Sequence, residues 1–357
     1  MTADLEWIDT HAKEVSLKHA EKAQARQADL TKPLGSLGEL EDIAVRLAAM
    51  QYTEEPTTNP THICIFASDH GVAEMGVSAY PQSVTGQMIK NFSDGGAAIN
   101  VLAKQLQATL QVISLGVVND ISGPDEIERI PHLTATENIA VKPAMTLPEL
   151  ILAINAGHDS IERVCNAGVR LFIGGEMGIA NTTAASAMAC AHLGLTPEHM
   201  AGPGTGLDAL GVQKKSKIVE LAIKQYEKSK LNDGPLEILR CLGGLDIAGL
   251  VGSYIRSGQR GVPVLIDGFI SSVAALTACR INPSVLKWFF FGHQSAEPGH
   301  RYILDNLNVK PMLNLKMRLG EGSGAAIAAI LLRAACELHN SMATFESAGI
   351  ASNTNGR

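Results

Sequence analysis

The sequence has few aromatic residues, no long apolar run and no strong basic patch, and each absence excludes a class of protein. Aromatic residues make up 4% of its 357 residues. No uninterrupted apolar run reaches the roughly 18 residues that a membrane-spanning helix needs, so we expect no membrane span. The formal net charge is −7 and the basic cluster Lys214–Lys217 is short, so we also expect no nucleic-acid partner.

The six cysteines are scattered along the chain and form no C-x-x-C pair. Several lie inside apolar runs, as Cys64 does between Ile63 and Ile65, which is typical of reduced thiols in the core of a cytosolic protein. The first residues contain no basic segment followed by an apolar one, so no secretory signal is evident. We therefore expect a cytoplasmic protein.

Two kinds of pattern are present along the chain. Residues 1–50 are charged, alanine-rich and helical in their spacing, whereas between about 61 and 295 short runs rich in valine and isoleucine alternate with alanine-rich helical patterns. Strands that are buried under helices on both faces have this composition. The predicted strands are His62–Ala67, Thr109–Leu115, Val169–Ile173, Val262–Ile266 and Leu286–Phe291.

These patterns predict an α/β fold with a mostly parallel sheet and helices on both faces, a Rossmann-like three-layer arrangement. We expect the two chain ends, 1–60 and 300–357, to form a small helical domain, and 61–299 to form the large α/β domain that carries a nucleotide site. Open parallel sheets bind ligands beyond the carboxyl ends of their strands, where the glycine-rich segments of this sequence fall.

One carboxylate, Glu321, stands among three glycines in Arg318–Gly324, directly before an alanine-rich run. Glycine lets a ligand approach the backbone closely, and burial in a tight loop raises the pKa of a carboxyl group toward the working pH. Glu321 is therefore a candidate general base. The alternative is that it only complements the dipole of the helix that follows.

Two further glycine-rich segments are candidate anion sites. Gly174–Thr183 follows a predicted strand and opens a helix, so its N–H groups could bind phosphate together with Asn181 and Thr182; the alternative is a capped helix with a tight turn. Gly202–Asp208 precedes Lys215 but lacks the Walker A spacing, and no strand-linked G-x-G-x-x-G is present. Together the segments favour an anion the size of a mononucleotide.

Polar side chains follow two other predicted strands. Ser68–Pro81 gathers Asp69, His70 and Glu74 in a loop, but it lacks the H-x-x-E or H-x-H spacing that would support a metal site. Gly292–His300 follows an apolar strand, and its simplest interpretation is a strand-to-helix turn. No G-x-S-x-G elbow is present, and we expect no metal.

Taken together, these segments resemble the nicotinate-nucleotide:dimethylbenzimidazole phosphoribosyltransferase family, which activates the lower base of cobamides. The matching stretches follow the family's order: Lys32–Gly38, Asp69–Ala73 with Gly76–Gln82, Gly175–Ile179 with Asn181–Thr183, Gly202–Gly206, Ser295–His300 and Leu319–Gly324. One departure is Ala180, where the family usually has glycine. Alanine costs about 1 kcal/mol there if that backbone position needs φ > 0.

The resemblance implies that nicotinate mononucleotide donates phosphoribose to 5,6-dimethylbenzimidazole or a related benzimidazole, giving nicotinate and an α-ribazole-type 5′-phosphate without a cofactor. It implies that Glu321 takes a proton from the acceptor and that Glu176 orients the ribose or supports charge at C1′. The residues implied for the phosphate and ribose are Gly175, Gly178, Asn181, Thr182, Gly202, Gly204, Thr205, Lys215 and Ser295. Those implied for the base are Tyr80, Met88, Met177 and Leu319.

Two alternatives stay open beside this interpretation. An apolar slot of this kind fits a phenol or cresol as well as a benzimidazole, so a phenol-activating paralogue is the first. The second is a non-catalytic nucleotide-binding subunit, against which the presence of Glu321, Glu176 and both glycine-rich segments argues. The resemblance also implies a homodimer, or pairing with a paralogous chain.

Overall fold

The computed structural model describes residues 3–119 and 127–351, and its centre is one seven-stranded sheet in which every neighbouring pair is parallel. The strands are β1 Thr61–Ala67, β2 Thr109–Ser114, β3 Glu128–Arg129, β4 Leu171–Met177, β5 Val264–Ile266, β6 Phe289–His293 and β7 Pro311–Leu313. Their order across the sheet is β3-β2-β1-β4-β5-β6-β7. The predicted α/β class is confirmed.

The strand order changes direction between β1 and β4: β2 and β3 lie on one side of β1, and β4 to β7 lie on the other. These two strands pair over seven residues, from Thr61 opposite Leu171 to Ala67 opposite Met177, and every residue of β1 is buried. Such a reversal leaves a crevice outside the carboxyl ends of the two strands, because the connections leave it toward opposite sides. The polar segments that follow β1 and β4 therefore lie next to each other.

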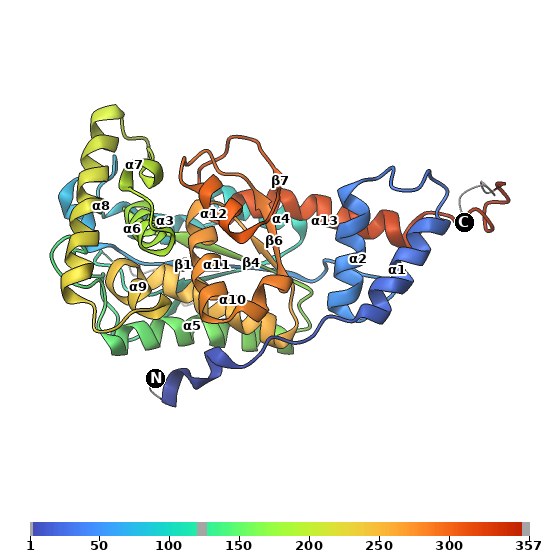
Figure 1. The fold of residues 1–357 in the computed structure, drawn as a ribbon, viewed down its shortest axis with the longest axis horizontal. Coiled ribbons are helices and arrows are strands. Elements are labelled where there is room, and N and C mark those ends of the chain that lie inside the picture. The colour runs from blue at the N-terminus through green and yellow to red at the C-terminus, as the bar shows by residue number, and fades with distance from the viewer. Residues whose placement is uncertain (1–2, 120–126, 352–357) are drawn as a thin grey trace.

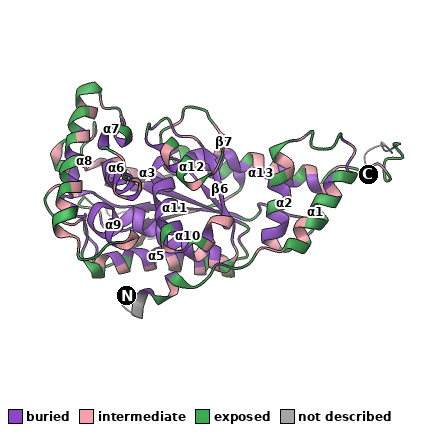
Figure 2. Ribbon diagram, viewed as in Figure 1, coloured by how far each residue is buried: buried purple, intermediate pink, exposed green. Residues whose placement is uncertain are grey.

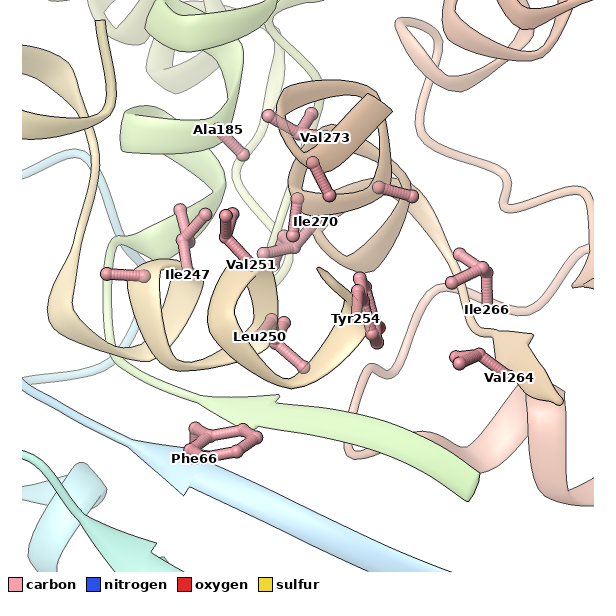
Figure 3. Packing of buried hydrophobic residues seen from close by; sticks show 14 of the residues in the cluster. Phe66, Ala185, Ile247, Leu250, Val251, Tyr254, Val264, Ile266, Ile270 and Val273 are labelled. Atoms are coloured by element: carbon pink, nitrogen blue, oxygen red, sulfur yellow. The ribbon is translucent and has the colours of Figure 1, made fainter. Parts of the chain in front are cut away.

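Helices cover both faces of the sheet and make three layers (Figure 1). One face is covered by α5 Leu147–Asn166, α10 Leu245–Arg260 and α11 Phe269–Ile281, and the other by α3 Val84–Ser93, α4 Ala98–Leu106 and α13 Ser323–Ser341. In Figure 3, Leu250 and Tyr254 of α10 point toward the strands, and Phe66 of β1 lies on the sheet beneath them. Figure 2 shows α5 exposed on its outer side only, as its amphipathic sequence requires.

The remaining helices lie beyond the sheet or at its edge. They are α6 Asn181–Leu193, α7 Pro197–Met200, α8 Ala209–Ser229, α9 Pro235–Leu242 and α12 His300–Leu307, with 3-10 helices at Ala3–Asp9, Gly71–Met75 and Pro283–Trp288. Helix α6 is buried on nearly every side because α8, α9 and α11 all pack against it, which explains its run of alanines. Among the described residues, none of the helices is long and apolar enough to cross a membrane.

Helices from the N-terminal and C-terminal parts of the chain lie together at one end of the molecule, whereas the first described residues, Ala3–Asp9, lie away from it against α5 and α10 (Figure 1). Helices α1 Leu17–Asp29 and α2 Glu39–Gln51 pack together there, and α2 packs against α13 (Figure 1). Arg26 of α1 donates hydrogen bonds to the carbonyl oxygens of His339 and Asn340 at the end of α13. A boundary at residue 299 falls between strands β6 and β7 of one sheet, so we propose that the small helical domain begins after residue 313 on the C-terminal side. Residues 1–2 and 352–357 of the expected domain lie outside the described ranges.

Three sequence-based details of the strands differ from the structure. Strand β4 continues to Met177, so Gly174 and Gly175 lie inside the strand and not in the turn that we expected after it. Strand β6 begins at Phe289, because Pro283 starts a 3-10 helix. The short strands β3 and β7 were not predicted, since two or three residues give no visible alternation.

Candidate active site

A cleft of about 280 Å³ opens at the carboxyl ends of β4, β5 and β6. The predicted site residues that line it are Tyr80, Glu176, Met177, Gly178, Asn181, Thr182, Gly204, Thr205, Ser295 and Leu319. Gly175, Gly202, Lys215, Met88 and Glu321 do not line it. Segments as far apart as 80 and 319 in the sequence thus meet at one cleft, at the carboxyl ends of the strands.

Several lining residues were not predicted from the sequence. They are Ile179, Asp267, Gly268, Phe269, Ile270, His293, Glu297, Arg318 and Gly320. Asp267 directly follows β5 and His293 ends β6, so the rule that places ligands at strand carboxyl ends could have identified both. Arg318 donates to the carbonyl oxygen of Gly204 at 2.7 Å and ties the 318–320 segment to the second glycine-rich loop.

Glu176 is a buried carboxyl at the inner end of the cleft, with 6% of its surface exposed. Burial raises its pKa well above the ordinary value of 4.5, and the negative charges of Asp246 and Asp267 raise it further. One hydrogen bond opposes this effect: the side-chain amide of Asn181 donates to Glu176 Oε2 at 2.5 Å. Glu176 therefore holds a proton at a higher pH than an exposed glutamate.

Glu321 lies in a loop of unusual backbone geometry. Gly320, Glu321 and Gly322 all have left-handed φ values, of 89°, 62° and 77°. A non-glycine residue in this region costs about 1–3 kcal/mol and persists where the surroundings hold it in place. Gly175 makes room for the loop, because a Cβ atom at that position would come within 2.6 Å of the Glu321 carbonyl oxygen.

The Glu321 side chain is 5% exposed, and among the described residues its Oε2 has no hydrogen-bond partner. Burial raises its pKa above 4.5, while a hydrogen bond from the backbone N–H of Ile99 lowers it and the charge of Asp267 raises it. Ile99 lies in the first turn of α4, so Glu321 faces the start of that helix and not of α13, the helix that follows it in the sequence. A raised pKa and a free oxygen atom are what a general base needs.

A buried lysine lies behind one wall of the cleft. Lys215 of α8 has no exposed surface, and its Nζ donates to Thr182 Oγ1 at 2.8 Å and to the Gly202 carbonyl oxygen at 3.3 Å. Burial lowers its pKa to about 8. Glu297 accepts a hydrogen bond from the backbone N–H of Gly204 at 2.9 Å on the same wall. This wall combines helix-start N–H groups, hydroxyl groups and the positive charges of Lys215 and Arg318, which suit an anion, with the carboxyl group of Glu297 as an opposing group.

The backbone at Ala180 is left-handed, with φ of 78° at the N-cap of α6. This position therefore does require φ > 0, and alanine is strained where glycine would not be. Its neighbours Asn181 and Thr182, the first residues of α6, face the cleft. The left-handed backbone at Ala180 therefore lowers the free energy of unfolding relative to a glycine at this position.

The cleft also has several apolar lining residues. Tyr80, Met177, Leu319, Phe269 and Ile270 line it, and Tyr80 and Leu319 are 55% and 58% exposed. The Thr205 hydroxyl accepts a hydrogen bond from the backbone N–H of Ala79, which links the loop that carries Tyr80 to the second glycine-rich loop. Within the described ranges, no group of three or more His, Cys, Asp or Glu side chains could hold a metal ion.

Comparison with known proteins defines the class. The family model described as phosphoribosyltransferase matches residues 12–350, and the chain belongs to this family. A curated relative from Pseudomonas putida strain F1, a nicotinate-nucleotide–dimethylbenzimidazole phosphoribosyltransferase, is 53% identical over 334 residues, which cover 93% of this chain and 94% of the relative. A relative of the same name from Pseudomonas syringae pv. syringae is 51% identical over 97% of this chain and 98% of its own length.

A solved structure agrees with these matches. The crystal structure of CobT from Thermus thermophilus superposes with a TM-score of 0.88 and is 40% identical, covering 94% of this chain and all of that one. The predicted family is therefore confirmed. These homologues are phosphoribosyltransferases, enzymes of the glycosyltransferase class.

Proposed function

We propose that this chain transfers phosphoribose from nicotinate mononucleotide to an aromatic base and releases nicotinate. The observation that carries the proposal is one cleft that has an anion-binding wall and the buried carboxyl group of Glu176 at its inner end. A second buried carboxyl group of raised pKa, Glu321, directly follows the lining residue Gly320. The names and near full-length identity of the relatives support the same reaction.

The donor's 5′-phosphate would bind at the wall formed by Thr182, Gly204 and Thr205, with the charge of Lys215 behind it. The ribose would then lie near Glu176, which would orient it by hydrogen bonds or, when ionised, stabilise positive charge that develops at C1′. The pyridinium leaving group becomes neutral as its bond to C1′ breaks, so its departure needs no general acid. Both substrates bound in one cleft would react faster through proximity alone.

The acceptor needs a base because one of its ring nitrogens attacks C1′ while the other loses a proton. Glu321 would accept that proton at its free Oε2 atom. One direct displacement inverts the configuration at C1′ and yields an α-ribotide. Since the pKa of Glu321 is raised, the acid limb of the pH–rate profile should lie above the ordinary glutamate value of 4.5.

The acceptor would occupy the apolar side of the cleft, between Tyr80, Met177 and Leu319. A flat ring with few polar groups fits this lining, and the names of the relatives favour 5,6-dimethylbenzimidazole or a related benzimidazole. A phenol or cresol is the second candidate, because its hydroxyl group could lose a proton to Glu321 in the same way. Purines present polar edges that this side of the cleft does not match.

We also propose a homodimer in which a second copy closes the cleft. Tyr80 and Leu319 leave apolar surface exposed at its mouth. The segment Lys32–Gly38 matches the family but joins α1 to α2, at the end of the molecule away from α6 and α8 (Figure 1). Sedimentation at micromolar concentration tests this arrangement, and a strict monomer that turns over substrate would contradict it.

The decisive test is turnover with nicotinate mononucleotide and a panel of benzimidazoles, phenols and purines, with products identified by mass. We expect nicotinate release and an α-ribotide with benzimidazoles. Products only with phenols would identify a phenol-activating paralogue. Donor binding without nicotinate release, for any acceptor, would instead identify a non-catalytic subunit.

A further inference from the structure

A buried polar network continues behind Glu176, away from the cleft. The imidazole Nε2 of His70, which follows β1, lies 3.0 Å from Asp246 Oδ1 at the start of α10. The other oxygen of Asp246 accepts a hydrogen bond of 3.2 Å from the side-chain amide of Asn181, which also donates to Glu176. His70 and Asp246 are 1% and 0% exposed, and neither lines the cleft.

Helix capping accounts for only part of this network. Asp246 Oδ1 accepts the backbone N–H of Ile247, and the backbone N–H of Asp246 donates to Ser68 Oγ, so an aspartate at the start of α10 is locally favourable. Helix capping does not explain why Asp246 Oδ2 accepts a hydrogen bond from Asn181. It also does not explain why the histidine beside Asp246 is buried. Burying ionisable groups costs stability, and such networks are kept where they fix one conformation.

The fold also keeps space for the imidazole. His70 lies between Gly178 and Gly244, where a Cβ atom would come within 3.1 Å and 2.2 Å of ring atoms. Gly178 belongs to the loop that leads into α6, and Gly244 immediately precedes α10. The ring is therefore wedged between the two elements that carry Asn181 and Asp246.

The geometry determines how Asn181 is oriented. Its amide nitrogen is the shared donor between two carboxyl groups, so the amide cannot flip without placing its oxygen against both of them. Glu176 Oε2 is thereby fixed by Asn181, Asn181 by Asp246, and Asp246 by His70. A change at His70 or Asp246 should reach the cleft through Glu176.

We propose that His70 and Asp246 are positioning residues that hold Asn181, and through it Glu176, in the orientation required at C1′ of the donor. Neither touches substrate in this arrangement. The inference rests on the proposed phosphoribosyl transfer and adds two residues to it.

The charged groups that face Glu176 come from three elements. Asp246 lies at the start of α10, Asp267 directly after β5 and Glu321 before α13, while Asn181 contributes a neutral amide from α6. In the described part of the chain, the side-chain hydrogen bonds and ion pairs of these carboxyl groups involve no lysine or arginine. Removing the charge of Asp246 should therefore lower the pKa of Glu176.

The first test compares His70→Gln with His70→Leu. Glutamine can keep an N–H near the position of imidazole Nε2, whereas leucine has a similar size and no donor. We expect His70→Leu to lower kcat by about 10²-fold with little change in the KM for nicotinate mononucleotide, because misplacing a reacting group costs that much. His70→Gln should retain most of the activity.

The matched control is His192, which is also buried, pairs with Thr277 at 2.9 Å and lies outside the cleft. His192→Leu should lower the melting temperature without the fall in kcat. Equal losses in His70→Gln and His70→Leu, or a change in KM alone, would overturn the proposal. Wild-type protein that binds donor without turnover would instead refute the proposed function.

The second test does not depend on whether the His70 variants fold. Asp246→Asn keeps the size of the side chain and removes the charge beside Glu176. Its single oxygen can accept from Asn181 only by giving up the hydrogen bond from the backbone N–H of Ile247, so some loss of helix capping is expected as well. We expect the limb of the kcat–pH profile that reports Glu176 to move to lower pH, because the charge of Asp246 raises the pKa of Glu176. An unmoved profile with only a lower melting temperature would mean that Asp246 is a helix cap and nothing more.

Discussion

Replacing Lys215 by methionine should make the protein more stable and its donor binding weaker. Methionine keeps the length and apolar stem of lysine but carries no charge. Burial lowers the pKa of Lys215 from 10.5 to about 8, so the protonated side chain destabilises the folded state. At 1.36 kcal/mol for each unit of pKa, this penalty is about 3 kcal/mol at pH 7.

The pH dependence separates this effect from lost hydrogen bonds. Below pH 8, Lys215 is charged in both the folded and unfolded protein, and the full penalty applies. Between pH 8 and 10.5 the folded protein binds fewer protons than the unfolded one, so the stability of the wild type rises relative to that of Lys215→Met. By pH 10 only about 1 kcal/mol of the penalty should remain. The hydrogen bonds to Thr182 and Gly202 are lost in the variant at either pH, at about 1 kcal/mol each.

Urea unfolding of both proteins at pH 7 and pH 10 measures this difference. We expect the advantage of Lys215→Met to shrink by about 2 kcal/mol over that interval. The neighbouring Lys214 is exposed, so Lys214→Met is the matched control and should show no such change. A stability difference that is the same at both pH values would refute the reasoning about burial.

Calorimetric titration gives the functional half of the prediction. Lys215→Met should weaken nicotinate mononucleotide binding by about 1.5–3 kcal/mol, the order of the attraction between a phosphate and one positive charge that lies behind Thr182 without touching it. It should affect nicotinate riboside, which lacks the phosphate, much less. Equal losses for the two donors would show that Lys215 supports the loop structure and not the phosphate.

Three further predictions follow from the cleft and the strained loops. Glu321→Gln should lower turnover at least about 10²-fold while donor affinity stays the same, and near-normal turnover would contradict its role as base. Ala180→Gly should raise the free energy of unfolding by about 0.5–1 kcal/mol. The substitution relieves about 1–2 kcal/mol of left-handed backbone strain and loses roughly 0.8 kcal/mol of methyl burial. A lower stability in urea would contradict this. A chain that ends after residue 315 lacks α13, which packs on β6, α4 and α2. Circular dichroism should therefore show this fragment unfolded. A folded and active fragment would contradict the role of Glu321.

The sequence alone determined the class of fold and the family. Alternation of apolar runs with helical patterns predicts a parallel sheet, because strands covered on both faces must be apolar throughout. A position that usually holds glycine also predicts φ > 0 at Ala180, and the backbone there is left-handed. Most residues that the family motifs assign to the site do line one cleft.

Only the tertiary structure decided how these residues are arranged. The sequence leaves open whether Glu321 only complements the helix after it, whereas in the structure its carboxyl group accepts from Ile99 of α4, more than 200 residues away in the sequence. The family motif assigns Lys215 to the phosphate site, and in the structure this lysine lies fully buried and donates to Thr182, a residue that lines the cleft. Burial and long-range charge set the pKa values of both groups, and these depend on which elements pack together and not on neighbours along the chain.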